Sequence, residues 1–360
     1  DQFDTTLAKI NAAGNETYGA KSGSMPKPQL MWSPRIGFNW DVTGGQTNQL
    51  RGGVGLFTGR LPLVWPGGAY TNNGLMMGSL TEDDTYRLSD YPQWNNQPAP
   101  AVKQGGGGQV DLFAENFKFP QVLRANLAYD RKLPWGMIGT IEGLFSKTIN
   151  NMLYYNVNLE PSSKNQTGNG NDTRPLFDGY GSKIESAYDH IIVGTNTNKG
   201  YTYNFTLQVQ KPYYKGFTGS LAYSYGRAMS IIDGTSSQNS SQWRYMEHVR
   251  GRNDLDLSYA DFDLGSRIVG FLAYSKEYLN FGRTTISLYY NGQSGQRFSW
   301  IYSENVIEDE QWSALGDLFF VPASVNDINL VDIGNPGDAD YVSAAQQWTD
   351  LDEFINSQPY

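Results

Sequence analysis

Strict alternation of apolar and polar side chains marks three segments of the chain. In residues 201–211, YTYNFTLQVQK, aromatic and aliphatic residues take every second position, and Thr, Asn and Gln take the others. Residues 217–226 and 283–291 repeat the pattern, with hydroxylic residues prominent in the polar set. Because successive side chains of a strand point to opposite faces of its sheet, this period predicts strands with one apolar and one polar face. The turn PYYKG at 212–216 makes the first two segments an antiparallel hairpin.

Weaker alternation predicts three further hairpins. Residues 121–131 and 138–148 flank the turn LPWG, and residues 33–42 and 49–57 flank TGGQTN. Residues 266–276 precede the strand at 283–291 across EYLNF, but both of their faces are mixed, so their orientation stays open. The predicted hairpins therefore lie near 33–57, 119–148, 201–228 and 263–291.

Short and long connections alternate along the chain. Within each hairpin the turn is a handful of residues, whereas the segments that follow the hairpins are long; these lie near 58–118, 149–200, 229–262 and 292–360. Unstructured connections of this length are uncommon in compact soluble domains. Outer-membrane barrels have short periplasmic turns and long extracellular loops, because hydrocarbon forces backbone groups to pair strand to strand. We therefore predict an all-β transmembrane antiparallel barrel whose apolar set faces lipid and whose polar set faces the lumen.

The composition argues against several kinds of partner and binding site. The chain has 24 Tyr, 17 Phe, 9 Trp and 40 Gly, and its net charge of -9 argues against a nucleic-acid partner, which would require a basic surface. It has no cysteine and only two histidines, His190 and His248, so disulfides, thiolate sites and His-rich metal sites are excluded. No run of about 18 apolar residues predicts a transmembrane helix.

The predicted strands suit an open piece of a larger barrel. We expect about eight to ten strands at about ten residues per membrane crossing. The final residues, LDEFINSQPY, do not resemble a closing strand. The polar sets carry bulky or charged groups such as Arg124, Asp130 and Glu142, which are typical of a wide, wet lumen.

Four long runs resemble the barrel of Oar-like TonB-dependent receptors. They cover 33–74, which begins SPRIGFNWDV; 110–152, which begins VDLFAENFKF; YSYGRAMSIIDGTSSQNSSQWR at 223–244; and FDLGSRIVGFLAYSKEY at 262–278. The resemblance implies a barrel of about 22 strands, normally plugged by an N-terminal domain, that imports a bound ligand with energy passed through TonB.

We accordingly expect residues 1–360 to be one partial barrel domain, the later portion of such a receptor, without the plug domain. The expected partners are outer-membrane lipid, TonB through N-terminal parts outside these residues, a surface lipoprotein or other outer-membrane protein, and an extracellular ligand. The expected location is the outer membrane of a Gram-negative cell.

Two loop segments are candidate ligand sites. The stretch TGRLPLVWPGGAYTNNGLMMG at 58–78 joins an apolar aromatic run to amides, and its candidate contacts are Arg60, Trp65, Tyr70, Asn72 and Asn73. The stretch SSQNSSQWRYME at 236–247 offers Trp243, Arg244 and Tyr245, side chains that suit sugars or peptides by stacking and hydrogen bonding. Because loop residues also cap and pack, a purely structural role is the favoured interpretation of both segments.

The sequence contains few motifs that indicate catalysis or metal binding. Four aspartates in DLDLSYADFD at 254–263 offer oxygen ligands for calcium, but their spacing is not that of an EF-hand loop. No zinc-protease or serine-hydrolase motif is present. We expect no enzyme activity, no catalytic residue, no metal ligand and no cofactor. The alternatives to import are a passive or structural, adhesive outer-membrane barrel and, less favoured, a soluble glycan-binding β-protein.

Overall fold

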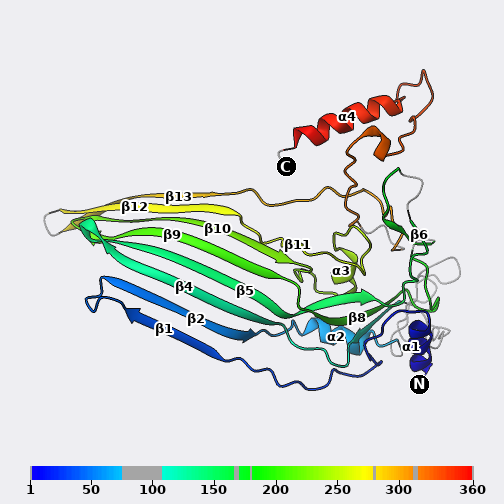
Figure 1. The fold of residues 1–360 in the computed structure, drawn as a ribbon, viewed down its shortest axis with the longest axis horizontal. Helices are drawn as coiled ribbons and strands as arrows, with labels where there is room; N and C mark the ends of the chain where they lie inside the picture. The colour runs from blue at the N-terminus through cyan, green and yellow to red at the C-terminus, as the bar shows by residue number, and fades with distance from the viewer. Residues whose placement is uncertain are drawn as a thin grey trace, which may run out of the picture.

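In the part of the chain that the structure describes, one curved sheet of 11 strands contains a continuous run of eight antiparallel strands, which is open at both edges (Figure 1). The computed structural model describes residues 2–74, 108–165, 170–178, 181–278, 281–310 and 315–358. The middle of the expected loop near 58–118 and part of the EYLNF turn lie outside these ranges. Along the sheet the strands are β1 (Arg35–Asp41), β2 (Asn48–Thr58), β4 (Gln121–Leu133), β5 (Met137–Asn156), β9 (Tyr201–Tyr214), β10 (Phe217–Ser230), β12 (Ser266–Tyr278) and β13 (Gly282–Gln293).

Strand register places the apolar sets of neighbouring strands on one common face. Leu207 of β9 lies opposite Ile141 of β5 and Tyr223 of β10, and all three side chains face outward. Leu207 is 42% exposed, although it lies halfway along a central strand. The alternation predicted from the sequence is confirmed, and it gives the sheet an exposed apolar face of the kind that contacts lipid.

The opposite face of the sheet carries a ladder of polar and charged side chains. Arg51 of β2 places its Nε 2.9 Å from a carboxylate oxygen of Asp130 and its Nη2 3.6 Å from Glu142 on β5. The hydroxyl of Thr140 donates to Asp130 at 2.6 Å. Charges paired in this way on one face are consistent with a wet lumen.

The register also resolves the orientation of β12, which the sequence left open. Its residue Leu272 lies opposite Leu288 of β13, and Tyr274 lies opposite Ile286. Tyr223, on the apolar face of β10, lies opposite Ile268 of β12. Leu272 and Tyr274 lie an even number of positions after Ile268, so they share this exposed apolar face. Phe271, which makes the pattern look mixed, lies on the polar face opposite Tyr289.

The short turns gather at one end of the sheet, on the left of Figure 1. The β9–β10 turn is tighter than predicted, because β9 extends to Tyr214 and only Lys215 and Gly216 lie between the strands. Both have positive φ, 48° and 90°, as a two-residue hairpin turn requires. A Cβ on Gly216 would lie 2.5 Å from the Ser275 carbonyl oxygen, so this position requires glycine. At the β4–β5 turn lies a short helix, η3 (Pro134–Gly136).

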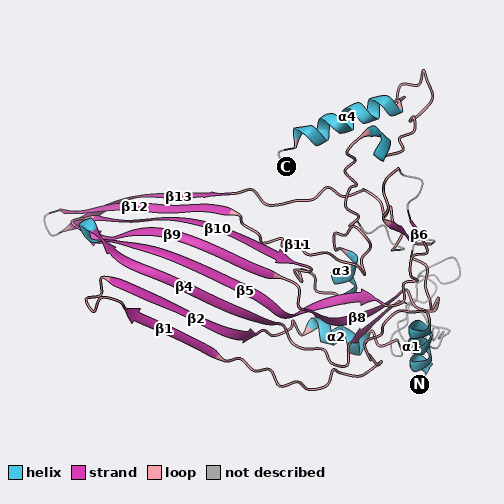
Figure 2. Cartoon of the chain, in the orientation of Figure 1, coloured by secondary structure: helices cyan, strands magenta, loops and turns pink. Residues whose placement is uncertain are grey.

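The long connections fold together at the other end of the sheet into a packed unit, here called the loop body. None of its elements was predicted from the sequence, because their patterns are short and irregular. They are α1 (Gln2–Ala12), α2 (Val64–Thr71), β3 (Gln109–Phe113), β6 (Lys164–Asn165), β7 (Pro175–Leu176), β8 (His190–Thr197), α3 (Asn239–Arg244), β11 (Ser258–Tyr259) and η4 (Val325–Asp327). Helix α4 (Ala344–Ser357) lies near η4 but away from the helices α1, α2 and α3, and it has no buried residue (Figure 2).

Strand β5 joins the sheet to the loop body. It is 20 residues long, pairs with β9 from Ile138 to Lys147, and then pairs with β8 from Asn151 to Asn156. Strand β8 in turn pairs in parallel with β3. The segment expected as a loop near 149–200 is therefore partly an extension of the wall.

Two hydrophobic cores lie on opposite sides of the β3–β8 ribbon. On one side, Ile191 and Val193 pack against Phe3 and Leu7 of α1. On the other side, Ile192 packs with residues of α2, β5 and α3. Because alternate residues of one strand point into different cores, the ribbon is buried on both faces. No helix in the described ranges is both long enough and apolar enough to cross a membrane.

The assignment of faces predicts how a charge is tolerated on β9. Leu207→Arg places a charge on the apolar face halfway along the strand and should destabilise the membrane-inserted sheet by about 2–4 kcal/mol. Gln208→Arg, the matched control on the polar face, should cost much less. Urea unfolding of the full protein in lipid vesicles measures both variants. Equal losses would mean that the two faces are assigned wrongly.

Candidate functional site

The two loop segments singled out from the sequence lie against each other. The indole Nε1 of Trp65, on α2, donates to the backbone oxygen of Ser236 at 3.0 Å. In return the Asn239 side chain, on α3, donates to the backbone oxygen of Trp65 at 3.1 Å. Helix α2 is thus hydrogen-bonded both to α3 and to the residues that precede α3.

The two tryptophans in these segments lie in the core. Trp65 is 3% exposed and Trp243 is 1% exposed, and both belong to the same hydrophobic cluster. The indole of Trp243 donates to Asn253 Oδ1 at 2.8 Å, and Asn253 Nδ2 donates to the backbone oxygen of Asn156 at 2.8 Å. Trp243 is therefore fixed to the end of β5, and neither ring is available for stacking on a ligand while the loop body is folded.

Three other candidates are also engaged within the protein. Asn72 donates to Asp111 Oδ2 at 2.9 Å, and the backbone oxygen of the buried Asn73 accepts from Ser22 Oγ at 2.6 Å. The Nε of Arg244 lies 3.5 Å from Glu310 Oε1. These contacts hold the segment after α2 and the end of α3 in place.

The remaining three candidates are exposed. Tyr70 and Tyr245 have 59% and 61% of their surface exposed, and Arg60 is also exposed at the start of its connection. Tyr70 lies on α2, Tyr245 directly follows α3, and Arg60 precedes α2. The structure therefore separates the predicted set into side chains that build the loop body and side chains that face outward from it.

A cluster of buried ionisable side chains lies beside α3, and sequence reasoning did not find it. We call it the buried charge cluster; its members are Arg174, His190, His248, Arg252, Asp309, Glu310 and Asp317, each at most 7% exposed. A parallel bridge between His248 and Asp317 brings together segments that are far apart in the sequence. His248 N donates to the Gly316 oxygen at 3.0 Å, and Leu318 N donates to the His248 oxygen at 3.0 Å.

Several members of the buried charge cluster are paired. The Arg252 guanidinium forms an ion pair with Asp309, whose other oxygen accepts from the Arg252 backbone N at 2.8 Å. His190 Nε2 lies 2.9 Å from a carboxylate oxygen of Glu310. Such pairing offsets the large cost of removing charges from water.

His248 and Asp317 are less well satisfied. Within the described ranges, both ring nitrogens of His248 and the Oδ1 of Asp317 are buried and have no hydrogen-bond partner, although Nε2 and Oδ1 are only 3.2 Å apart. Burial, assisted by the charges of Arg252 and Arg174, lowers the pKa of His248 to about 2, so its imidazole is neutral. Burial also raises the pKa of Asp317, whose Oδ2 accepts from the backbone N of Ile307 at 3.0 Å.

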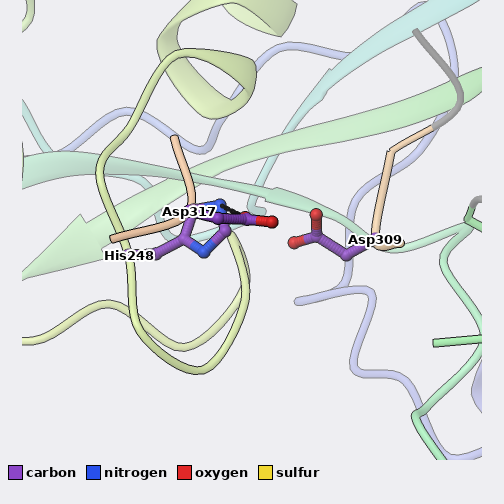
Figure 3. A group of neighbouring side chains, drawn as sticks. All are labelled: His248, Asp309 and Asp317. Carbon is purple, nitrogen blue, oxygen red and sulfur yellow. Dashed lines mark ion pairs between the residues drawn. The ribbon is translucent and has the colours of Figure 1, made fainter. Parts of the chain in front are cut away.

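Figure 3 shows that the Asp309 carboxylate points toward the same space as these two side chains. One ligand atom from each of His248, Asp309 and Asp317 lies within 4.8 Å of the others. An imidazole nitrogen and two carboxylate oxygens are donors that divalent transition metals accept. Among the residues that the structure describes, this is the one group of such side chains close enough to share an ion.

Three of the four aspartates considered for calcium, Asp254, Asp256 and Asp263, form ion pairs with arginines. Arg250 forms ion pairs with Asp254 at 2.7 Å and with Asp256 at 2.9 Å. Asp263 forms an ion pair with Arg297 at 2.6 Å and accepts from the Ala228 backbone N. Arg250 and Arg297 thus balance part of the negative charge of this stretch.

Removing one partner of a buried pair should destabilise the loop body. Arg252→Met leaves the Asp309 carboxylate buried without its guanidinium, and we expect a loss of about 3–5 kcal/mol in the stability of the loop body. The matched control is Arg250→Met, two positions away, whose exposed ion pairs should contribute little. Native-state hydrogen exchange of β8 amides measures the effect. Similar protection in both variants would contradict it.

The buried Asp111 should make the loop body pH-dependent. Burial raises the pKa of Asp111 above its ordinary value of 3.8, so the folded state retains a proton that the unfolded state has lost. Stability is therefore highest below pH 3.8 from this group and falls as pH rises through the folded pKa. Asp111→Asn removes this titration. The difference in hydrogen-exchange protection between variant and wild type should therefore change between pH 3.8 and the folded pKa of Asp111. A difference that is constant with pH would contradict the assignment.

Comparison with known proteins agrees with this architecture. A family model described as "Outer membrane beta barrel domain" matches residues 1–310, which is most of the chain. No curated protein is significantly similar to it. The match covers the whole sheet and most of the loop body, and it supports a location in the outer membrane. The chain belongs to the outer membrane β-barrel domain family.

Proposed function

We propose that this chain forms part of the wall and the surface loops of a Gram-negative outer-membrane receptor, which captures an extracellular ligand and imports it with energy delivered through TonB. The resemblance of four long runs to Oar-like receptors suggests the energy source. The loop body suggests capture, and it is the observation that carries the proposal.

The loop body is a single packed unit rather than a set of separate loops. It has two hydrophobic cores, a buried charge cluster and a direct strand connection to the wall through β5. Burying Trp243 and Trp65 orders the segments that present Tyr70 and Tyr245 to the outside. Surface groups held in a fixed arrangement lose less conformational entropy on binding than mobile ones, which favours ligand capture.

The sheet suits a barrel with more strands than it contains. Among the described residues, strands β1 and β13 are edges, each paired on one side only. Unpaired backbone groups at an edge cost several kcal/mol each in hydrocarbon, so a membrane barrel must pair them. We propose that additional strands of a barrel of about 22 strands pair with these edges. The charged ladder at Arg51 then faces a wide lumen, which in such receptors holds the plug.

A genetic comparison tests the energy source. Strains lacking this protein, lacking TonB, or lacking both should grow equally poorly on the nutrients for which this protein is required, because the two deletions block one pathway. A panel of iron chelates, oligosaccharides and peptides as sole sources supplies the probes. Growth that depends on the protein but not on TonB would indicate a passive barrel, and no nutrient defect would indicate a structural or adhesive one.

A second arm tests the capture surface. The double variant Tyr70→Ala and Tyr245→Ala should reduce growth on the same nutrient at unchanged surface abundance, because it removes exposed aromatic contacts without opening the core. Tyr213→Ala is the matched control, since Tyr213 is 62% exposed but lies at the opposite, short-turn end of the sheet. Equal growth of both variants would exclude these tyrosines from ligand capture.

A further inference from the structure

We propose that His248, Asp309 and Asp317 bind a divalent transition-metal ion, for which Zn²⁺ is the best match, and that the ion fastens the loop body from inside. The proposal does not depend on TonB-coupled import. It rests on three features of these side chains: their unsatisfied polar atoms, their mutual distances and the segments they connect.

The first feature is the lack of hydrogen-bond partners. His248 is 2% exposed, and neither of its ring nitrogens has a hydrogen-bond partner among the described residues. The neighbouring Asp317 is fully buried, and its Oδ1 is also unsatisfied. Buried polar atoms are nearly always paired, and an unpaired one costs about 1–3 kcal/mol. A cation between the imidazole and the carboxylate would satisfy both groups at once.

The second feature is the spacing of the donor atoms. His248 Nε2 and Asp317 Oδ1 are 3.2 Å apart, and one oxygen of Asp309 completes a set whose atoms lie within 4.8 Å of one another. Ligands bonded to Zn²⁺ at about 2.0–2.2 Å lie about 3.4 Å apart when the site is tetrahedral. The pair distance already fits, and a small inward movement of Asp309 would complete the arrangement.

The donor types select the class of metal. An imidazole nitrogen beside two carboxylates favours Zn²⁺ and similar first-row ions, whereas Ca²⁺ and Mg²⁺ prefer oxygen ligands alone. With three protein ligands, the fourth position of a tetrahedral ion is left for water or another side chain.

Neighbouring groups hold the donors in place. The Arg252 side chain forms an ion pair with Asp309, and the backbone N groups of Val306 and Ile307 donate to the second oxygen of Asp317. Contacts of this kind orient metal ligands. A carboxylate has enough lone pairs to accept from Arg252 and bind an ion at the same time. The positive charge of Arg252 opposes the ion, and the negative charges of Asp309 and Asp317 compensate for it.

The third feature is that the three residues come from segments far apart in the sequence. His248 follows α3, whereas Asp309 and Asp317 lie in the segment beyond β13. An ion bound by all three would tie this segment to α3 and, through Trp243 and Asn253, to the end of β5. Metal binding would therefore stabilise the loop body rather than perform chemistry.

Metal content and affinity test the proposal. The full protein, purified in detergent and stripped with a chelator, is titrated with Zn²⁺ alone by calorimetry, and its bound zinc is measured by mass spectrometry. We expect a single tight equivalent in the wild type. Asp317→Asn and His248→Gln should each weaken binding at least about 10–100-fold, because removing a ligand costs no less than removing a supporting contact. Asp254→Asn, the matched exposed control, should retain the equivalent.

A measurement on the wild type guards against variants that fail to fold. Co²⁺ added to the stripped protein should give the intense visible bands of a four-coordinate site, and X-ray absorption should show one imidazole among oxygen ligands. Absence of a tight equivalent in the wild type, retention of it in both ligand variants, or a spectrum of six oxygen ligands would each overturn the proposal.

Discussion

Backbone hydrogen bonding in a medium without water is the constraint on which this structure depends. Hydrocarbon offers no partner to an N–H or C=O group, so each membrane-spanning strand must pair with its neighbours along its length. Pairing fixes the register, and register fixes which side chains share a face. The apolar face at Leu207 and the charged side chains around Arg51 both follow from the backbone hydrogen bonds between neighbouring strands. Function is then left to the loops, where water is available and irregular backbone is tolerated.

The sequence predicted the wall well because the wall follows a simple period. Alternation located most of its strands, since a membrane selects side chains by face alone. It left β12 open because Phe271, an aromatic residue, lies on the polar face opposite Tyr289, and so the two faces of the strand look alike in the sequence. It predicted too long a turn after β9, because Pro212 and Tyr213 look like turn residues although β9 extends through them. Neither the closing of the barrel nor its number of strands follows from these residues.

The loop body could be predicted much less well, for a different physical reason. Its elements are short and its cores unite segments that are far apart, so no local period marks them. Trp65 and Trp243 drew attention as ligand contacts because a tryptophan in a polar loop serves either a core or a binding surface, and the sequence does not distinguish the two. The buried charge cluster was missed because His248 has no unusual neighbour along the chain; Asp317 reaches it only through the bridge between two distant segments.

The continuity of β5 also determines how a load on the loop body would reach the sheet. Because one strand belongs to both the wall and the loop body, a pull on the body along the strand axis is resisted by the ladder on each side of β5, whose bonds are then loaded in shear and share the force. A loop attached only by a flexible connection would instead swing and pass no force to the wall. Anything large that binds this body is thus anchored mechanically in the membrane.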